Sequence, residues 1–205
     1  RMFSSGDLVV NLTSDDTGEA TVPETVTIAD GQTTSPSFNI DAIDDDSVDG
    51  TQTVTITANE ASHTPGTDTL EVKDDDTAGL TVSTISGDTT ETGGTAIFSV
   101  VLNTQPTNDV TIGILSSNTA EGMVDKSSLT FTGTDWANPQ TVTVTGQDDD
   151  IVDGDVAYTI VADPASSTDT DYDGMIADDV SVINLDDDTA MLTVSIAANS
   201  VSEGA

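Results

Sequence analysis

The sequence predicts an all-β protein made of antiparallel β-sandwiches in tandem. Three observations support this fold class. Apolar and polar residues alternate over many short segments, Val and Thr dominate those segments, and turn residues separate them about every ten residues. No stretch has a helical period, and turns at this spacing favour a sandwich over a parallel sheet. The predicted strands lie at 8–12, 51–57, 96–102, 109–115, 128–132, 141–145, 156–161, 180–185 and 191–196.

Self-similarity within the chain indicates a repeat architecture. Each repeat contains a series of strands, an Asp run, a long strand, a loop, a further strand and a second Asp run. Three pairs of segments carry the repeat: DDDTAGLTVS at 74–83 with DDDTAMLTVS at 186–195, DDDSVDG at 44–50 with DDDIVDG at 148–154, and SDDTGEATV at 14–22 with SSNTAEGMV at 116–124.

The repeat sets the expected domain boundaries. Residues 1–77 form a sandwich that lacks its first strand or strands, and residues 78–189 form a complete one, of a size typical of immunoglobulin-like domains. Residues 190–205 are the first strand of a following repeat, or a donor strand for a neighbouring chain. We therefore expect the chain to be an excerpt of a longer polypeptide. The linkers at 77–78 and 189–190 contain no flexible Gly/Ser stretch, which predicts a stiff, extended rod.

Composition excludes several classes of function. Lys and Arg total 3 against 38 Asp and Glu, which gives a formal net charge of -35. No basic surface is therefore available for nucleic acid or anionic lipid. No apolar run is long enough to span a membrane, so direct membrane insertion is not expected. With one His and no Cys, neither a Ser/His/Asp triad nor a thiolate site is credible, and we expect that the protein is not an enzyme.

The Asp runs are the most informative residues. Each follows a predicted strand, where loops of a sandwich converge, and calcium takes six to eight oxygen ligands from such loops. Two carboxylates about 5 Å apart repel by roughly 3 kcal/mol at an effective dielectric near 20, so a cluster needs cations. The sequence therefore predicts several bound calcium ions at the loop ends between repeats. The alternatives are solvated loops that limit edge pairing, and a halophilic surface.

The motifs resemble those of the Calx-beta family, the calcium-binding modules of sodium–calcium exchangers, which are also repeated in large bacterial surface proteins. An early SEGA motif stands at 202–205, with ETGG at 91–94 as its counterpart. A DDD-x-x-acid run stands at 44–49 and 148–153, and a terminal DDD at 74–76 and 186–188. In addition, residues 127–150 resemble the repeats of long bacterial adhesins.

The resemblance implies a calcium cluster in each unit. This sequence departs from the family at three places: Asn118 stands in the place of Asp16, and Gln52 and Val156 stand where the family has a further acid, although Asp155 adjoins the second. We therefore expect fewer or more weakly held ions. The implied ligands are Asp16, Asp44, Asp45, Asp49, Asp74, Asp75 and Asp76 with the Ser47 carbonyl in the first unit, Glu91, Asp148, Asp149, Asp153, Asp155, Asp186, Asp187 and Asp188 with the Ile151 carbonyl in the second, and Glu203 in the tail.

Other residues are assigned packing or loop positions. The segment DTDYDG at 169–174 matches the start of an EF-hand loop, but its twelfth position is Val180 rather than Glu, so a polar hairpin loop is predicted, with an isolated calcium site as the alternative. Trp136 is expected to pack beside a strand start. His63 and Tyr172 are expected in exposed loops, and Phe98, Phe131 and Tyr158 in core or half-buried strand positions.

The expected function is structural: a calcium-stabilised repeat segment of an extracellular rod, fibre or adhesin stalk, at a bacterial cell surface. Its partners would be neighbouring repeats or copies of the same chain. One alternative is a filament subunit that assembles head to tail, with 190–205 as the donor strand and Glu203 completing the acceptor's calcium site. The other is a glycan- or protein-binding adhesion module, for which one Trp and few aromatic residues give little support.

Overall fold

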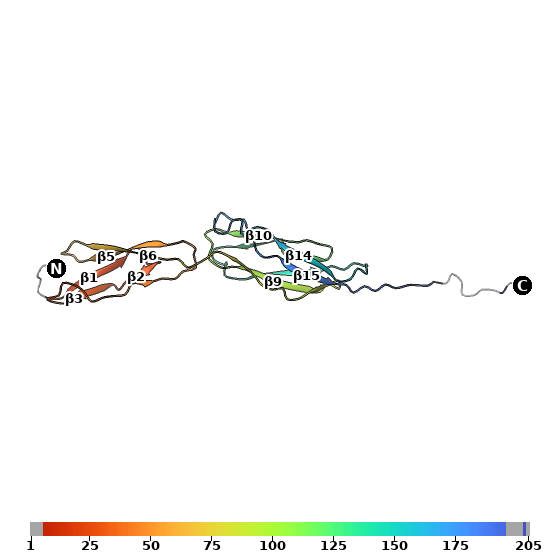
Figure 1. Ribbon diagram of the computed structural model, residues 1–205, viewed down its shortest axis with the longest axis horizontal. Coiled ribbons are helices and arrows are strands. Elements are labelled where there is room, and N and C mark those ends of the chain that lie inside the picture. Colours follow the sequence, from red (N-terminus) through yellow and green to blue (C-terminus); the bar gives the residue numbers. More distant parts are fainter. Residues whose placement is uncertain (1–5, 196–202, 204–205) are drawn as a thin grey trace.

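A computed structural model of the chain describes residues 6–195 and 203. The described residues contain no helix, and therefore no helix long and apolar enough to cross a membrane. Every strand pair is antiparallel except β15–β8, which confirms the predicted class of antiparallel β-sandwiches (Figure 1). The strands are β1 (Leu8–Ser14), β2 (Ala20–Thr21), β3 (Thr25–Ile28), β4 (Asp41–Ala42), β5 (Gln52–Asn59), β6 (Gly66–Val72), β7 (Leu80–Val82), β8 (Thr89–Thr90), β9 (Thr95–Leu102), β10 (Val110–Ser116), β11 (Gly122–Val124), β12 (Ser128–Phe131), β13 (Gln140–Gly146), β14 (Val156–Ala162) and β15 (Val180–Leu185).

The strands form two units that lie end to end (Figure 1). The N-terminal unit, strands β1 to β6, has a four-stranded sheet of order β3-β1-β5-β6 and a two-stranded sheet of β2 and β4. The C-terminal unit, strands β7 to β15, has a five-stranded sheet of order β12-β10-β14-β15-β8 and a four-stranded sheet of order β11-β13-β9-β7. The two units therefore share a sheet arrangement but differ in the size of the second sheet.

The C-terminal unit has a closed core between its two sheets. Alternate residues of β9, β13 and β14 face inward, so Phe98, Val142 and Tyr158 are buried, and Phe131 joins them from β12. The expected core positions of Phe98, Phe131 and Tyr158 are confirmed, and Trp136 packs against the same cluster as expected.

The prediction that Tyr172 lies in an exposed loop was wrong. It is 1% exposed rather than exposed, because its hydroxyl is paired with the backbone of the loop after β9. The hydroxyl donates to the Thr104 carbonyl at 2.8 Å and accepts from the Thr104 N–H at 3.1 Å. A phenol with a buried polar partner can contribute its ring to the core. His63 is exposed, as expected.

The N-terminal unit has a much smaller buried cluster, made of Ala20, Val54 and Ile56. Its larger sheet has the same inward alternation, and Leu12 of β1 is buried as well. The smaller sheet consists of two short strands, so part of the inner face of the larger sheet has no layer over it.

The tail beyond β15 is where the predicted strand pattern was wrong. The strand expected at 191–196 is not formed at 191–195, where the residues are exposed and unpaired, and position 196 lies outside the described residues. An extended segment becomes a strand only when a partner supplies the ladder of hydrogen bonds. Along 190–195 the chain runs away from the C-terminal unit (Figure 1).

The two units also touch beside the linker. The Gln105 N–H, in the loop after β9, donates to the Asp46 carbonyl at 2.7 Å, and Ser47 and Gln105 form an isolated parallel bridge. Ala78, directly after the linker, packs against the core of the C-terminal unit. The loop at 44–49 is therefore fixed against the next unit by backbone contacts.

Candidate metal centres

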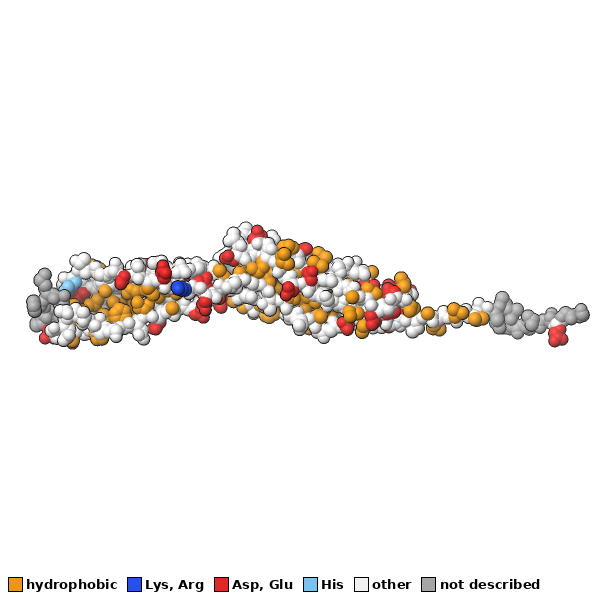
Figure 2. Space-filling view, viewed as in Figure 1, with side chains coloured by type: hydrophobic (Ala, Val, Ile, Leu, Met, Phe, Trp, Pro, Cys, Tyr) orange, Lys and Arg blue, Asp and Glu red, His pale blue; other side chains and the backbone are white. Residues whose placement is uncertain are grey.

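The acidic loops of each unit converge at one end of its sandwich. In the C-terminal unit they follow β8, β13 and β15 at the end that faces the tail. In the N-terminal unit they lie at the end that faces the C-terminal unit. Figure 2 shows the corresponding acidic side chains at the waist between the units and at the far end of the C-terminal unit. Strands β8 and β15 run parallel to each other, so the acidic loops that follow them leave the sandwich at the same edge.

Three groups of carboxylates form in the C-terminal unit, and the ligand oxygens within each group lie within 4.8 Å of one another. Glu91 belongs to two of these groups, so it can bridge two neighbouring cations. The groups are Glu91 with Asp148 and Asp187, Glu91 with Asp186 and Asp188, and Glu121 with Asp149 and Asp153.

Glu91 is the central residue of this cluster and is 3% exposed. Its carboxylate accepts a hydrogen bond from the Asp187 N–H at 3.4 Å. Burial raises the pKa of Glu91, and the nearby carboxylates of Asp186, Asp149 and Asp188 add to the rise. A buried acid surrounded by other acids is stable in its ionised form only when a cation compensates the charge.

Asp188 shows the same imbalance. Its Oδ2 is buried and has no hydrogen-bond partner. Burial raises the pKa of Asp188, and the charges of Asp186, Asp150, Asp187 and Asp148 raise it further. Since buried polar atoms are nearly always paired, an unpaired carboxylate oxygen facing other carboxylates fits a metal ligand.

Glu121 is a cluster residue that the sequence analysis missed. It is buried, it approaches Asp149 and Asp153, and the Asn184 side-chain amide donates to it at 3.3 Å. The signal was present in the sequence: in the aligned segments at 14–22 and 116–124, Glu19 and Glu121 are the one acidic residue that both copies share.

Glu19 has the equivalent role in the N-terminal unit, where its carboxylate groups with those of Asp45 and Asp49. Burial raises the pKa of Glu19, and Asp49, Asp16 and Asp45 raise it further. Glu19, Asp45 and Asp49 line a small cavity of about 30 Å³, whose charged wall also includes Asp44, Asp74, Asp75, Asp76 and Lys73.

The same hydrogen bonds shape the Asp runs in both units. Asp45 and Asp149 each accept the N–H two residues later at 2.7 Å. The first Asp of each terminal run accepts N–H groups from the other loop: Asp74 from Gly50 at 2.8 Å and Asp186 from Gly154 at 2.7 Å. Each of these four carboxylates is therefore oriented by the backbone.

Several predicted ligands lie outside the groups. Asp16 is exposed and accepts the Gly18 N–H at 3.0 Å, and Asn118 accepts the Ala120 N–H at 3.2 Å, so both stabilise the turn before a strand. Asp155 is exposed and accepts the Asp186 N–H at 3.2 Å. Glu203 is exposed and belongs to no group among the described residues. The Ile151 carbonyl accepts the Asp153 N–H at 2.9 Å.

The loop at 169–174 is organised by hydrogen bonds rather than as an EF-hand. Asp169 is buried, and its two carboxylate oxygens accept the N–H groups of Thr107 at 2.7 Å and Asp171 at 3.0 Å. Asp169 belongs to none of the acid groups among the described residues, so its hydrogen bonds make it a structural residue of the hairpin. That agrees with the polar loop predicted there.

The donor set of the two acidic clusters suits a hard cation. Within the described residues the one ion pair is His63 with Glu60. Lys73 lines the N-terminal cavity without forming an ion pair, and a single ammonium leaves the seven acids around it largely uncompensated. Ligands that are all oxygen, on loops with several carboxylates, fit calcium. Magnesium holds water and prefers fewer carboxylates, and zinc prefers His or Cys.

No family model matches the chain, and no curated protein matches it. The similar solved structures include surface layer protein SbsC, domains 4–9, at 16% identity over 90% of this chain with a TM-score of 0.36. They also include S-layer protein rSbsC(31-844), at 16% identity over 86% of this chain with a TM-score of 0.33. The chain spans 23% and 19% of those two chains, and similarity at this level carries no information on function.

Proposed function

We propose that the chain is a calcium-stabilised segment of an extracellular rod or adhesin stalk, built from Calx-beta-like repeats. The observation that carries the proposal is Glu91, which is buried among the carboxylates of Asp148, Asp186, Asp187 and Asp188 with no Lys or Arg beside it. An uncompensated buried acid cluster opposes folding, whereas the same cluster around cations favours it.

Calcium would act through thermodynamic linkage. Folding brings Glu91, from the loop after β8, beside Asp188, from the loop after β15, and it brings Glu121, from the loop before β11, beside Asp149. A cation that binds this arrangement, and not the unfolded chain, stabilises the fold by about 2.7 kcal/mol per site when its concentration is one hundred times Kd. Domains are stable by only about 5–15 kcal/mol, so two or three ions would decide whether the unit is folded.

The N-terminal cluster adds a mechanical role, because it lies in the loop that contacts the next unit. Asp45 and Asp49 face the acid cavity, while the carbonyl of Asp46 between them accepts the Gln105 N–H. A cation that holds both carboxylates would fix the conformation of this loop. Binding would therefore restrict bending between units, as a load-carrying stalk requires.

Thermal unfolding with calcium and with chelator tests the proposal. Trp136 is the one Trp of the chain and lies in the C-terminal unit, so its fluorescence reports that unit alone. We expect calcium at about one hundred times Kd to raise Tm by about 10 °C or more relative to chelator. An unchanged Tm would exclude calcium as the stabilising ligand.

Glu91→Gln provides the specific variant and Asp178→Asn the matched control, since Asp178 is an exposed acid at the opposite end of β15. In calcium, Glu91→Gln should lose most of the shift in Tm, because it removes a ligand from two groups. In chelator the same variant should melt above the parent chain, because it removes buried charge. Asp178→Asn should follow the parent chain in both buffers.

A further inference from the structure

A buried network of polar side chains adjoins the acid cluster of the C-terminal unit. It contains Tyr158 of β14, Thr89 of β8 and Asn184 of β15, each at most 5% exposed. The Thr89 hydroxyl lies 3.0 Å from the Tyr158 hydroxyl and 3.0 Å from the Asn184 side-chain oxygen. The Asn184 amide then donates to the Gln147 carbonyl at 2.9 Å and to the Glu121 carboxylate at 3.3 Å. The network therefore connects the core to a candidate metal ligand.

The direction of these hydrogen bonds follows from which groups can donate. The Gln147 carbonyl and an ionised Glu121 only accept, so the nitrogen of Asn184 faces them and its oxygen faces Thr89. Thr89 has a single hydroxyl hydrogen, and its neighbours at 3.0 Å and 3.2 Å, the Asn184 side-chain oxygen and the Ile183 carbonyl, are both acceptors. The Tyr158 hydroxyl therefore donates to Thr89, and the network runs in one direction from the core to the acid cluster.

The network reaches each chain segment that carries carboxylates of the cluster. Apart from Glu121, which is itself in the network, each contact point precedes a carboxylate by one or two residues. The pairs are Thr89 and Glu91, Gln147 and Asp148, and Asn184 and Asp186. The hydrogen bonds of Asn184 therefore join these segments where their carboxylates leave the sandwich.

Two glycines leave space for the network. Gly122 of β11 pairs with Gly146 of β13. A methyl group at Gly122 would overlap the Tyr158 hydroxyl, and one at Gly146 would overlap the Asn184 side-chain oxygen and the Thr90 carbonyl. The polar side chains can therefore occupy these positions only because the facing strands carry no side chain there.

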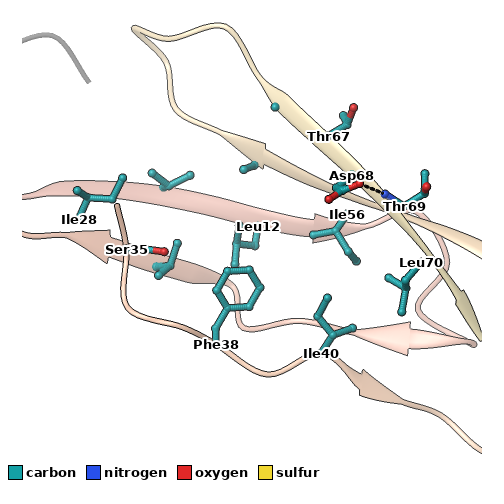
Figure 3. Close-up of a pocket in the computed structure, with 14 residues that line it drawn as sticks. Leu12, Ile28, Ser35, Phe38, Ile40, Ile56, Thr67, Asp68, Thr69 and Leu70 are labelled. Carbon is teal, nitrogen blue, oxygen red and sulfur yellow. Dashed lines mark hydrogen bonds between the residues drawn. The ribbon is translucent and has the colours of Figure 1, made fainter. Parts of the chain in front are cut away.

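The larger sheet of the N-terminal unit has the same strand pairing but an apolar inner face. Figure 3 shows Leu12, Ile56 and Leu70 on this face, where they line an open apolar groove of about 470 Å³. Ile56 and Leu70 are the equivalents of Ile160 and Val182 in the C-terminal unit. The two inner faces can therefore be compared position by position.

Four positions differ together between the units. The C-terminal unit has two polar side chains and two glycines where the N-terminal unit has two valines and two alanines. Tyr158, Asn184, Gly122 and Gly146 correspond to Val54, Val72, Ala20 and Ala42. The backbone between the acidic loops is nevertheless the same, since the Ile43 N–H donates to the Glu19 carbonyl at 2.8 Å as the Gln147 N–H donates to Glu121 at 2.9 Å. These loops therefore adopt their fold without the network, which points to a different role for it.

We propose that Tyr158 and Thr89 are positioning residues for the calcium site of the C-terminal unit. Their hydroxyls fix the Asn184 amide, and the amide holds the Glu121 carboxylate and the loop at Gln147 in the geometry that the cations require. The network therefore raises the affinity for calcium, beyond its contribution to the stability of the fold. Hydrogen-bond partners of metal ligands commonly change metal affinity by about 10- to 100-fold. The inference rests on the proposed function, because it assigns these residues a role at the same site.

Melting curves at a series of calcium concentrations test the inference, because the Trp136 transition reports the C-terminal unit alone. The calcium concentration at which Tm begins to rise gives the affinity, and Tm in chelator gives the stability of the metal-free unit. Thr89→Val keeps the shape of the side chain without its hydroxyl and should weaken calcium binding about tenfold. Thr89→Ser keeps the hydroxyl and should bind calcium within about twofold of the parent chain.

Tyr158→Phe removes the hydroxyl at the start of the network, and Tyr172→Phe is the matched control. Both tyrosines are buried in the same unit, but the Tyr172 hydroxyl bonds the Thr104 backbone, outside the network. Each variant should lower Tm in chelator by about 5 °C, because each loses one buried hydrogen bond. Tyr158→Phe should also weaken calcium binding about threefold or more, whereas Tyr172→Phe should leave the affinity unchanged.

The outcomes separate the inference from the proposed function. Parent-like calcium affinity in both Tyr158→Phe and Thr89→Val, with a lower Tm, would show that the network only stabilises the fold and would overturn the inference alone. An equal loss of affinity in Tyr172→Phe would overturn it as well, because affinity would then follow the overall stability of the unit. A parent chain whose Tm does not move with calcium would overturn the proposed function and, with it, the inference.

Discussion

The two units are built from the same repeat, yet one has a closed core and the other an open face. In the C-terminal unit the larger sheet is covered by four strands, and eighteen buried residues form one cluster. In the N-terminal unit two short strands cover the same sheet, and the cluster has three buried residues. The alternating pattern therefore prepares a face for burial, but a second layer has to be present to bury it.

The polar interiors of the units differ as well. The C-terminal unit contains a buried network in which the Thr89 hydroxyl contacts the Tyr158 hydroxyl at 3.0 Å and donates to the Asn184 side-chain carbonyl at 3.0 Å. The N-terminal unit has Val54 and Val72 in the places of Tyr158 and Asn184. The network connects the core to the acid cluster, because the Asn184 amide also donates to Glu121 at 3.3 Å.

The largest expected effect comes from one substitution made at the same position in both units. Ile56 and Ile160 are equivalent, since Ser14 pairs with Ile56 as Ser116 pairs with Ile160. Ile160→Ala should lower the free energy of unfolding of the C-terminal unit by about 3–5 kcal/mol, because the closed core cannot collapse around the cavity. Denaturation followed by Trp136 fluorescence measures the loss.

Ile56→Ala should cost the N-terminal unit about 1–2 kcal/mol, because this side chain borders the open groove and loses fewer contacts. Hydrogen exchange at the amides of β5 reports the loss, since neither Trp nor Tyr lies in this unit. Equal losses at the two positions would show that the groove is closed in solution and would contradict the comparison.

A smaller effect is expected from the polar network that only the C-terminal unit has. Asn184→Ala leaves the Gln147 carbonyl and Glu121 without the amide that donates to them, and should destabilise the unit by about 1–3 kcal/mol. It should also weaken calcium binding about tenfold, because Glu121 is no longer oriented. Calorimetric titration compares it with Asn138→Ala, an exposed Asn outside the cluster; equal affinities would show that Asn184 does not orient a ligand.

The comparison also shows which features the sequence could predict. Periodicity identified the strands that pair with other strands, such as 96–102 and 180–185, because alternation is a local property. It failed at 191–195, whose alternation is equally clear, because pairing depends on a partner that the described chain does not supply. Alternation shows that a segment can form a strand, but whether the strand forms depends on a neighbouring strand that pairs with it.

The sequence likewise predicted some residues of the acid clusters and missed others. The Asp runs were identified as converging loops, and Glu91 was placed with the second unit's runs, where the structure also puts it. Glu121 was missed. Asp16 was predicted as a ligand in place of Glu19, although in the turn before β2 the two side chains point in different directions. The Asp16 carboxylate accepts a hydrogen bond from the Gly18 N–H within the same turn, whereas the Glu19 carboxylate lies beside that of Asp45. Local backbone geometry sets this difference.

The smallest expected effect is the pH dependence of the buried acid that the N-terminal unit lacks. Since the pKa of Glu91 is raised above its ordinary value of 4.5, the folded state retains a proton that the unfolded state has lost just above that pH. Raising the pH through this window therefore lowers the stability of the metal-free protein. The Glu91→Gln variant has no group that titrates at this position. Other acids, such as Asp74, whose pKa is lowered by the N–H groups of Gly50 and Asp76, are present in both the parent protein and the variant, so their contributions cancel in the comparison. In chelator, the advantage in Tm of Glu91→Gln over the parent chain should thus be absent near pH 4 and grow toward pH 7, and calcium at pH 7 should reverse it.

Trp136 melting curves across this range measure the difference in Tm between the variant and the parent chain. A difference that stays constant with pH would mean that the pKa of Glu91 is not raised in the folded protein.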